Sequence, residues 1–579
     1  MSSVFAATPT ANDDLPLRLG RFASLREALD YAARGVTGLN FHDARGALTA
    51  VLSYTELRQR ALALARHWRM LGFMAGERIA LIAETSPQFL VHFYAAQYAG
   101  LVACPLPCRA VAGGHAAYVA QLQQLLAGIG PRAVFAPRGV LAQVRAAATG
   151  MTVACMDDTD VEVIGASGPS TLPTVDADVP AYLQFSSGST AQPKGVVVRQ
   201  SALMHNATAI AAHGLRMRAD DRACSWLPLY HDMGLVGFSV VALCGQRSVD
   251  YLPPMAFAAR PLAWLRLMSR CRTSIVYAPA FAWRLAAQRY RGEADIDLSA
   301  LRVAGVGGDM IQPELLDASA AALAPTGFRR EAFQPSYGMA EATLAISMSA
   351  PGVGPRTEAA VEDSAQPRTS KRYISCGAPL PGIELRVEDE HGQVLPERAA
   401  GRLWVRGPNV LRAYHSGHSD MGGEHPALRA DGFLDTGDLG FVSGGEVFPT
   451  GRAKELIIIR GRNLWPQDVE WLIERLPGLA PGDVAAFAAA DAQDEDALVL
   501  LIQHATGGEM LRAAVQTAVA EAFGVLARVV FVPPRSLPFT SSGKLARAHA
   551  RARYLAGEWQ PGACSAREAR DLTDAEAPA

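Results

Sequence analysis

Several features that would indicate other classes of protein are scarce or absent in this 579-residue sequence. Its 54 basic and 56 acidic side chains leave a formal net charge of -2, so no excess of one sign favours nucleic acid or an anionic membrane surface. The eight cysteines include no CxxC pair and no zinc-like spacing. Most of them are therefore expected to be buried, reduced thiols in a cytoplasmic protein.

Long hydrophobic runs are also lacking. The N-terminal stretch "MSSVFAATPTANDD" has no basic region followed by an apolar core, so it does not resemble a secretory signal. The most apolar later stretch, "GLVGFSVVALCG" from Gly234 to Gly245, is shorter than the roughly 18 to 20 residues that span a bilayer. We therefore expect no membrane span. No internal repeat is present, and the length predicts several subdomains.

The first two thirds of the chain alternate between helical and strand patterns. In the stretch from Tyr54 to Gly72, apolar residues recur at helical spacing, and Gly72 is placed to end the helix. Short apolar runs such as "RIALIAE", "GLVACPLP", "RAVFAPRG", "AYLQFSS", "SIVYAPA" and "LRVAGVGG" indicate buried strands. This alternation predicts an α/β fold in which helices cover parallel sheets and ligands bind beyond the strand ends.

From about Tyr373 the pattern becomes β-rich, with Gly and Pro turns, and a mixed α+β segment of the size of a small domain follows "KELIIIRGRN". We predict a large N-terminal domain of helix-covered sheets with a β-rich subdomain over residues 20–452, and a small C-terminal domain over 453–558. Residues 559–579 contain few large apolar groups, which is typical of a disordered tail.

A loop of small hydroxylated residues follows one predicted strand, in "YLQFSSGSTAQPKGVVV". Backbone amides in a glycine turn, neighbouring hydroxyls and one lysine can together bind an anion such as a polyphosphate. The residues concerned are Ser186, Ser187, Gly188, Ser189, Thr190 and Lys194. The loop is not a Walker P-loop, because GxxxxGK[ST] is absent. Taken alone, it could equally be an ordinary turn.

Two carboxylates lie in loops where they could serve the same ligand. Glu341, in "SYGMAEAT", follows a predicted strand and could hold a magnesium ion that also binds phosphate oxygens. Asp438, in "FLDTGDLG", is predicted to lie in a turn and could accept two hydrogen bonds from a ribose diol. The alternatives are a solvated surface Glu and an Asx turn.

Basic residues gather in two later stretches. "TGRAKELIIIRGRN" places Arg452, Lys454, Arg460 and Arg462 around an apolar strand, although an exposed basic rim would look the same. "FTSSGKLAR" places Lys544 after Ser, Ser and Gly near the end of the chain, where a lone lysine is usually solvated.

Together and in this order, these stretches resemble the adenylate-forming superfamily of acyl-CoA synthetases, luciferases and peptide-synthetase adenylation domains. The likeness is closest to the fatty acyl-AMP ligases, through "WLPLYHDMGLVG", "YGMAEAT" and "LIIIRGRNLWPQDVE". It extends from about Leu25 to Tyr554. It implies a small mobile C-terminal domain that rotates about a hinge near Lys454. It also implies ATP-dependent conversion of a fatty acid to acyl-AMP, with Mg2+, and transfer of the acyl group to the phosphopantetheine thiol of an acyl carrier protein.

The resemblance assigns roles position by position. Glu341 is the implied magnesium ligand, and Lys544 would bridge the substrate carboxylate and the α-phosphate after domain closure. His231 would lie beside the acyl carboxylate, unless it is a hydrogen-bonded core histidine. The implied nucleotide site consists of the 186–194 loop, Gly308, Asp309, Met310, Ser336, Tyr337, Gly338, Met339, Ala340, Asp438 and Arg452. By position, Met233, Phe281 and Trp283 are candidate acyl-pocket walls, although such residues are usually core.

Two departures from the family pattern, and a segment where the subfamily's insertion would lie in trimmed form, affect these expectations. Ala340 stands where many members have Thr, so one hydroxyl contact to phosphate is absent. "VGGDM", Val306 to Met310, replaces a Gly-Ala-Glu-Pro-like adenine segment. Residues 349–374 are long enough for the insertion that hinders the use of free CoA in acyl-AMP ligases, but this segment has no clear apolar anchor in the sequence.

Three alternatives to the fatty acyl-AMP ligase remain open. A fatty acyl-CoA synthetase would use the same adenylation step. An amino-acid-activating domain is less favoured, because no acidic residue is placed to bind an α-amine. A non-catalytic binding protein with this fold is disfavoured by the presence of both Glu341 and Lys544.

Overall fold

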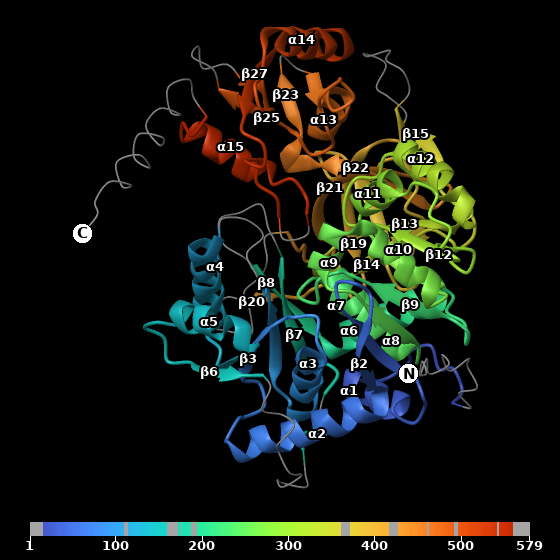
Figure 1. Cartoon of the computed structure of the whole chain (residues 1–579), viewed down its shortest axis with the longest axis vertical. Coiled ribbons are helices and arrows are strands. Elements are labelled where there is room, and N and C mark those ends of the chain that lie inside the picture. Colours follow the sequence, from blue (N-terminus) through green and yellow to red (C-terminus); the bar gives the residue numbers. More distant parts are fainter. Residues whose placement is uncertain are drawn as a thin grey trace. The chain divides into compact units, whose positions relative to one another are not determined.

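The computed structural model describes residues 15–108, 114–158, 172–174, 176–186, 194–360, 371–415, 427–459, 462–490, 496–540 and 543–559. The chain forms two compact units, and the change from the first to the second falls between Thr450 and Gly451 (Figure 1). The domain limits given above stay predictions. The predicted tail lies outside the described residues, apart from Trp559.

A nine-stranded sheet forms one half of the first unit. Its strand order is β17(Ala378–Pro379), β14(Ala345–Met348), β13(Phe333–Gly338), β12(Val303–Val306), β11(Ile275–Ala278), β9(Arg222–Ser225), β10(Ser248–Tyr251), β1(Gly38–His42), β2(Leu48–Ser53). The strands from β13 to β1 pair in parallel, and β2, β14 and β17 pair antiparallel. Because β11, β12 and β13 are parallel neighbours, their carboxyl ends meet at one edge of the sheet.

A seven-stranded sheet forms the other half. Its order is β20(Tyr414–His415), β8(Lys194–Arg199), β7(Pro180–Ser186), β4(Val102–Leu106), β3(Arg78–Ile82), β5(Ala133–Ala136), β6(Ala154–Asp157). The strands from β7 to β6 are parallel, whereas β8 and β20 join antiparallel at one edge. Strand β20 therefore adds a late part of the chain to a sheet that is otherwise built from the first two hundred residues.

The β-rich part contains a four-stranded sheet in the order β18(Glu384–Glu388), β19(Gly401–Arg406), β21(Leu434–Ser443), β22(Glu446–Arg452). A separate ribbon, β15(Thr357–Ala359) with β16(Arg372–Ile374), lies in the segment predicted to hold the insertion. No apolar anchor was predicted for that segment, but Tyr373 contacts the ring of Phe441 edge to face at 5.9 Å. Phe441 in turn stacks on Phe448 at 4.7 Å. An aromatic run therefore anchors the base of the segment, and residues 361–370 lie outside the described ranges.

Helices cover both faces of the seven-stranded sheet. Those of the first unit are α1(Leu25–Ala32), α2(Tyr54–Met70), α3(Pro87–Ala99), α4(Gly114–Ile129), α5(Leu141–Ala147), α6(Gln200–Ala209), α7(Asp232–Leu235), α8(Val241–Cys244), α9(Pro254–Ala259), α10(Pro261–Arg270), α11(Ala280–Arg289) and α12(Pro313–Leu323). In β3, Ala80 and Ile82 pack with α4 and α5, whereas Ile79 and Leu81 belong to the main core with α2 and α3. This alternation follows from the two-residue period of a strand.

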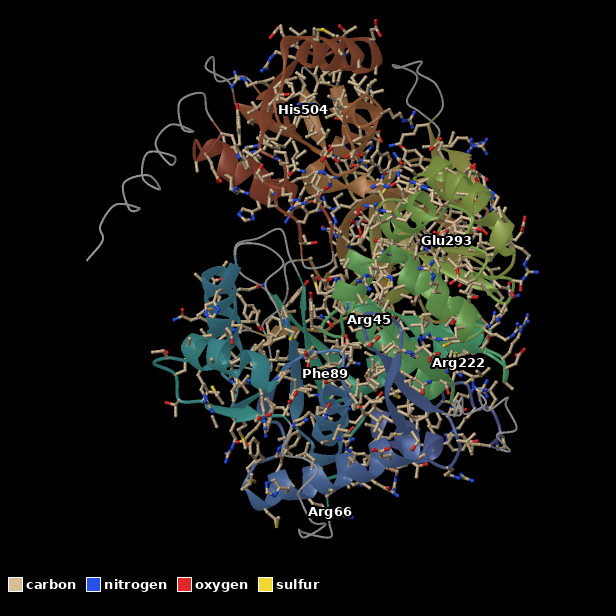
Figure 2. The ribbon with its side chains drawn as sticks, viewed as in Figure 1. Arg45, Arg66, Phe89, Arg222, Glu293 and His504 are labelled. Carbon is tan, nitrogen blue, oxygen red and sulfur yellow. The ribbon has the colours of Figure 1, made fainter. Side chains whose placement is uncertain are left out.

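Local signals explain where the central helices begin and end. Ser86 caps α3 by accepting a hydrogen bond from the amide of Phe89 at 3.3 Å, Pro87 occupies its first turn, and Gly100 ends it at φ +72°. Helix α2 confirms the predicted helix, although it ends at Met70 and Leu71 is 48% exposed instead of facing the core. Figure 2 labels Phe89, which is 2% exposed in the main core.

The second unit is a small α+β structure. It contains the ribbon β23(Ile457–Ile459) with β24(Arg462–Leu464) and the sheet β25(Val484–Ala490), β26(Asp496–Gln503), β27(Ala527–Val532). Its helices are α13(Pro466–Ile473), α14(Glu509–Phe523) and α15(Arg547–Leu555). Apolar residues form a cluster on each face of the three-stranded sheet, one of them with α13 and α14 and the other with α15. The predicted α/β fold with a large N-terminal and a smaller C-terminal part is confirmed.

The cysteines behave as predicted. Seven of the eight lie in the described residues, all are free thiols, and Cys104, Cys224, Cys244, Cys271 and Cys376 are buried. Burial raises the pKa of Cys244 and of Cys376 to about 12, so both stay protonated. Within the described ranges, no helix is both long enough and apolar enough to cross a membrane.

Candidate active site

The predicted phosphate loop lies between two antiparallel strands. Strands β7 and β8 pair antiparallel, with Ser186 opposite Lys194 at the end of the ladder. Ser187, Gly188, Ser189 and Thr190 lie outside the described residues, and only the backbone of Ser186 and Lys194 is described. Residues 187–193 therefore connect the last strand of the parallel part of the sheet to β8, which is followed by α6.

The predicted adenine segment and the start of the predicted magnesium motif lie at neighbouring strand ends. Strand β12 leads into Gly308, Asp309 and Met310, and it pairs in parallel with β13, which carries Ser336. The two segments are so close at Gly307 that a Cβ atom there would lie 2.7 Å from Ser336 Oγ. Long-range pairing thus brings together residues that the sequence separates by about thirty positions.

Strand β13 also carries a tyrosine that binds Asp438. The Tyr337 hydroxyl donates to Asp438 Oδ2 at 2.7 Å, and the Asp438 amide donates to Thr436 Oγ1 at 3.1 Å. The predicted turn at Asp438 is wrong, because the residue lies within strand β21. The register between β19 and β21 shifts at this point, and Gly437 has φ +74°. The turn-like sequence therefore forms a bulge inside a strand.

Glu341 lies in a short 3-10 turn, Ala340–Ala342, directly after β13. The backbone before this turn packs closely against the backbone after it, because a Cβ atom on Gly338 would lie 1.9 Å from the Leu344 carbonyl oxygen. The Tyr414 hydroxyl donates to Glu341 Oε1 at 2.7 Å. Burial and the adjacent Glu341 charge raise the pKa of Tyr414, so the phenol stays a donor.

The backbone after Glu341 is strained. Thr343 has φ +69° and ψ -55°, and the Leu344 amide donates to the Ala342 carbonyl at 2.8 Å, which closes a γ-turn. A β-branched residue in this conformation costs on the order of 1–3 kcal/mol and persists only where its surroundings fix it. Here the Thr343 hydroxyl donates to the Asn409 carbonyl at 2.8 Å, and Asn409 Nδ2 donates to the Ala342 carbonyl at 2.7 Å.

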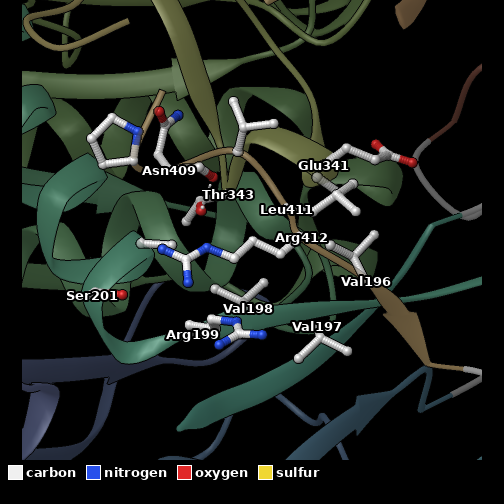
Figure 3. Close-up of a pocket in the computed structure, with 14 residues that line it drawn as sticks. Val196, Val197, Val198, Arg199, Ser201, Glu341, Thr343, Asn409, Leu411 and Arg412 are labelled. Atoms are coloured by element: carbon white, nitrogen blue, oxygen red, sulfur yellow. Dashed lines mark hydrogen bonds between the residues drawn. The ribbon is translucent and has the colours of Figure 1, made fainter. Parts of the chain in front are cut away.

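A pocket lies beside this turn, lined by β8, the start of α6, residues 340–343 and residues 408–412 (Figure 3). Two of its residues, Arg199 and Arg412, form ion pairs with Asp178 at 3.9 and 3.6 Å. Figure 3 shows the Glu341 carboxylate pointing away from the Arg412 guanidinium group. The arginines of this pocket therefore do not neutralise Glu341.

The predicted acyl-site residues differ in their surroundings. His231 Nδ1 lies 2.6 Å from Asp232 Oδ1, and its side chain is 26% exposed, so it is not a fully buried core histidine. Met233 and Phe281 are partly exposed. Trp283 is 0% exposed, and its indole N–H donates to the Gly305 carbonyl at 3.3 Å, which makes it a core residue. The proposed roles of all four stay predictions.

The remaining predicted residues lie in the second unit. Arg452 ends β22 and is exposed, and Lys454 lies in the short turn η8(Ala453–Glu455). Lys544 lies in a tight reversal, because Thr540 N donates to the Lys544 carbonyl at 2.7 Å. In return, the Lys544 amide donates to Thr540 Oγ1 at 3.1 Å. Arg460 lies outside the described residues, and Arg462 donates to the Phe523 carbonyl at 2.7 Å.

A buried ion-pair cluster joins the turn after Lys454 to the segment after Lys544. Arg547 Nη1 donates to Glu455 at 2.7 Å, and its other nitrogens donate to the two oxygens of Glu470 at 2.8 and 2.6 Å. The Glu470 side chain is only 4% exposed, and it also accepts a hydrogen bond from the Ala486 amide at 3.0 Å. The turn that contains Lys454 and the segment after Lys544 are therefore connected within one unit.

One further cluster contains residue types that can bind a metal, but its carboxylate forms an ion pair with an arginine. His42, Asp250 and Cys271 offer ligand atoms within 4.8 Å of one another. Arg222, labelled in Figure 2, donates to both Asp250 oxygens at 2.6 and 3.0 Å, and His42 Nε2 lies 3.0 Å from Oδ1. Burial raises the pKa of Asp250, but these hydrogen bonds and charges outweigh it and lower the pKa overall. The cluster serves as a buried ion pair that ties strands β1, β9 and β10.

Three contact residues were absent from the sequence-based site. Tyr414, Asn409 and Thr343 hold the Glu341 turn. Thr343 belongs to the quoted stretch "SYGMAEAT", but neither Tyr414 nor Asn409 lies in a recognisable motif. Asn409 is separated from the backbone it binds by 67 positions and Tyr414 from Glu341 by 73. Only the pairing of β20 with β8 could have indicated them.

Comparison with known proteins agrees with this geometry. The model of the AMP-binding enzyme family matches residues 41–415. A Caulobacter vibrioides protein, provisionally named an acyl-CoA synthetase, is 44% identical over 96% of this chain and 100% of its own length. The Moorena producens protein JamA, a medium-chain-fatty-acid–acyl-carrier-protein ligase, is 32% identical over 67% of this chain and 70% of its own.

The fold agrees equally well with a solved structure. A structure from a study of fatty acyl-adenylate ligases of E. coli and L. pneumophila superposes with a TM-score of 0.87 and 38% identity. It covers 93% of this chain and 99% of that chain. The family match spans most of the first unit, and the structural match includes both units. The chain therefore belongs to the AMP-binding enzyme family, and it is an adenylate-forming ligase that uses ATP.

Proposed function

We propose that the protein activates a medium- or long-chain fatty acid as acyl-AMP, with Mg2+, and transfers the acyl group to the phosphopantetheine thiol of an acyl carrier protein. In the first step a carboxylate oxygen attacks the α-phosphorus of ATP, and pyrophosphate leaves. In the second step the thiol sulfur attacks the acyl carbon, the thiol proton is lost to solvent, and AMP leaves.

One observation carries the first half of this proposal. Strand β13 and the turn after it place Tyr337 and Glu341 four residues apart, and Tyr337 binds Asp438 from another sheet. The candidate metal ligand and the tyrosine that binds the candidate ribose ligand thus lie at the carboxyl end of one strand, where α/β sheets bind their ligands. In this proposal, the sequence between β7 and β8 would supply backbone amides and the Lys194 ammonium group to the phosphates.

The residues around Glu341 fit a magnesium ion. In the described part of the chain, Glu341 forms no ion pair, and its Oε2 atom accepts no hydrogen bond, whereas Tyr414 occupies Oε1. A partly buried carboxylate oxygen with no cation beside it is a suitable ligand for a hard divalent cation. When bound, Mg2+ would neutralise charge on the phosphates as the two anionic reactants approach. Glu341 would hold and orient this ion.

Positioning and electrostatic stabilisation would provide most of the catalysis, because the attack brings negative charges together. Lys544 would supply a positive charge between the substrate carboxylate and the α-phosphate. His231, with Nδ1 against Asp232, would present its other ring nitrogen to the acyl carboxylate. Asp438, oriented by Tyr337, would bind the ribose.

Two substitutions test the roles of the charged residues. Lys544→Ala should lower ATP–pyrophosphate exchange about 10²- to 10³-fold, the cost of losing one transition-state donor, and should leave the Kd for ATP nearly unchanged. Arg475→Ala removes an exposed cation from the same unit and serves as the control. Glu341→Gln keeps an acceptor for Tyr414 but removes the charge, so exchange should fall and require more Mg2+. Wild-type exchange by Lys544→Ala would refute the assignment.

The acyl acceptor is tested by mass spectrometry. The full chain is incubated with ATP, Mg2+ and a panel of fatty acids, with free CoA in one series and a phosphopantetheinylated carrier protein in the other. Acyl-carrier product without acyl-CoA is the expected result. The support for the carrier is the likeness to JamA and to the fatty acyl-adenylate ligases.

A fatty acyl-CoA synthetase is the second candidate, because the 44% identical Caulobacter protein carries that name. It would form acyl-CoA in quantity in the same experiment. The absence of acyl-AMP and of both thioesters, beside an active control enzyme, would contradict both candidates and favour a non-catalytic binding protein.

A further inference from the structure

The chain between β19 and β20 wraps around the turn that carries Glu341. The Leu411 amide donates to the Glu341 carbonyl at 2.7 Å. Asn409, which is 1% exposed, donates to the Ala342 carbonyl at 2.7 Å, and Thr343 donates to the Asn409 carbonyl at 2.8 Å. The backbone of the turn is therefore fixed by this one segment through three hydrogen bonds.

The same segment continues into the sheet that carries the phosphate loop. In β20, Tyr414 pairs with Val196 and His415 pairs with Gly195, both in β8. Strand β8 begins at Lys194, the last residue of the predicted phosphate loop. The backbone of Tyr414 is thus hydrogen-bonded to the strand that leaves the loop, two residues beyond its lysine.

The Tyr414 side chain completes the connection. Its hydroxyl donates to Glu341 Oε1 at 2.7 Å, so one residue joins the phosphate-loop sheet through its backbone and the candidate metal ligand through its phenol. A carboxylate at the end of a flexible side chain has several rotamers, and a donor on one oxygen restricts them. It also leaves the other oxygen for a cation.

We propose that Tyr414 is a positioning residue that fixes the Glu341 carboxylate relative to strand β8, so that this carboxylate is held ready to bind the Mg2+ that accompanies ATP. This inference rests on the proposed role of Glu341. Tyr414 does not contact the reacting atoms in this scheme.

The test is ATP binding without any fatty acid, so that no turnover occurs. Isothermal titration calorimetry of the full chain measures the Kd for ATP at a series of Mg2+ concentrations. Tyr414→Phe removes only the hydroxyl, and it should raise the Mg2+ concentration for half-maximal ATP binding about tenfold, as is typical when a partner of a metal ligand is lost. The Kd for ATP at saturating Mg2+ should change little.

A matched control separates this effect from a general loss of a buried hydroxyl. Tyr54 is 0% exposed, and its hydroxyl donates to the Arg247 carbonyl at 2.9 Å, in a region without any candidate ligand. Tyr54→Phe should leave the Mg2+ dependence unchanged. An unchanged Mg2+ dependence in Tyr414→Phe, or an equal shift in both variants, would overturn the proposal.

A double-mutant cycle tests the route through Glu341. In a Glu341→Gln background, Tyr414→Phe should have almost no further effect on the Mg2+ dependence, because the ligand charge is already lost. A full additional tenfold shift would show that Tyr414 acts elsewhere and would overturn the inference. The proposed reaction is judged separately, by acyl-AMP formation, so that its failure is distinguishable from a failure of this inference.

Discussion

The buried ion pair of the second unit allows a prediction with a definite magnitude. Arg547→Met keeps much of the side-chain length but removes the charge and all three bonds to Glu470 and Glu455. Glu470 is 4% exposed at its side chain and would be left as an uncompensated buried carboxylate, whereas Glu455 is 31% exposed and can be solvated. Breaking a buried pair from one side costs about 3–5 kcal/mol, and an exposed pair contributes about 0–1 kcal/mol. Nearly all of the loss should therefore come from Glu470.

Hydrogen exchange of the full chain measures this loss locally. The Ala486 amide in β25 donates to Glu470 Oε1, so peptides covering β25 report directly on the pair. A loss of about 3–5 kcal/mol corresponds to exchange that is roughly 150- to several thousandfold faster in β25. The strands of the nine-stranded sheet, which belong to the other unit, should exchange at the wild-type rate.

Two further variants decide whether the reasoning holds. Arg551→Met removes an exposed arginine from the same helix, whose Nε donates to the Ala488 carbonyl at 2.8 Å, and should change exchange in β25 less than tenfold. Arg547→Met with Glu470→Gln removes the stranded charge and should recover a large part of the protection. An increase below threefold in Arg547→Met, or no recovery in the double variant, would refute the argument that the buried carboxylate carries the cost.

Two other predictions concern the first unit. Burial lowers the pKa of His92 to about 4, although its hydrogen bond to the Gln88 carbonyl opposes this shift. Between pH ~6.5 and pH ~4, His92 is therefore protonated in the unfolded chain but neutral in the folded chain. The free energy of unfolding should consequently fall as the pH drops through this range. Urea titrations at a series of pH values in this range give the free energy of unfolding as a function of pH. In His92→Asn the slope of this plot should be shallower by an amount that corresponds to at most one proton, and an unchanged slope would contradict the assignment. Tyr337→Phe should weaken ATP binding about three- to tenfold by removing the hydrogen bond that orients Asp438, but should weaken 2′-deoxy-ATP binding less. Equal losses of affinity for the two nucleotides, measured by calorimetry, would show that Tyr337 does not act through binding of the ribose.

Short-range patterns were sufficient to predict the layered part of the fold. The run that became β3 is apolar on both sides, and in the structure its two faces are covered by different helices. Only a strand between two helical layers requires such a run. The helix over Tyr54–Met70 was predictable for a similar reason, because its apolar positions recur with the period of a helix.

Features that depend on pairing between distant segments were predicted less well. The turn residues around Asp438 are also those of a bulge, and only the register of β21 against β19 distinguishes the two. The anchor of residues 349–374 was missed because Tyr373 packs on Phe441, which lies 68 positions later and belongs to another strand. For Tyr414 the local sequence contains no signal, since its role depends on the edge that β20 occupies.

The chemistry of the two candidate carboxylates explains why tyrosines hold them. An arginine or lysine beside Glu341 would fix its rotamer equally well, but it would also neutralise the charge and repel a divalent cation. A phenol donates a hydrogen bond at neutral pH while carrying no charge. Glu341 and Asp438 each accept from a tyrosine at 2.7 Å, whereas the buried carboxylates of structural pairs, Asp250 and Glu470, accept from arginines. At Glu341 the neutral partner orients the carboxylate and leaves its charge available for a ligand, so the choice of donor distinguishes this candidate binding carboxylate from the structural ones.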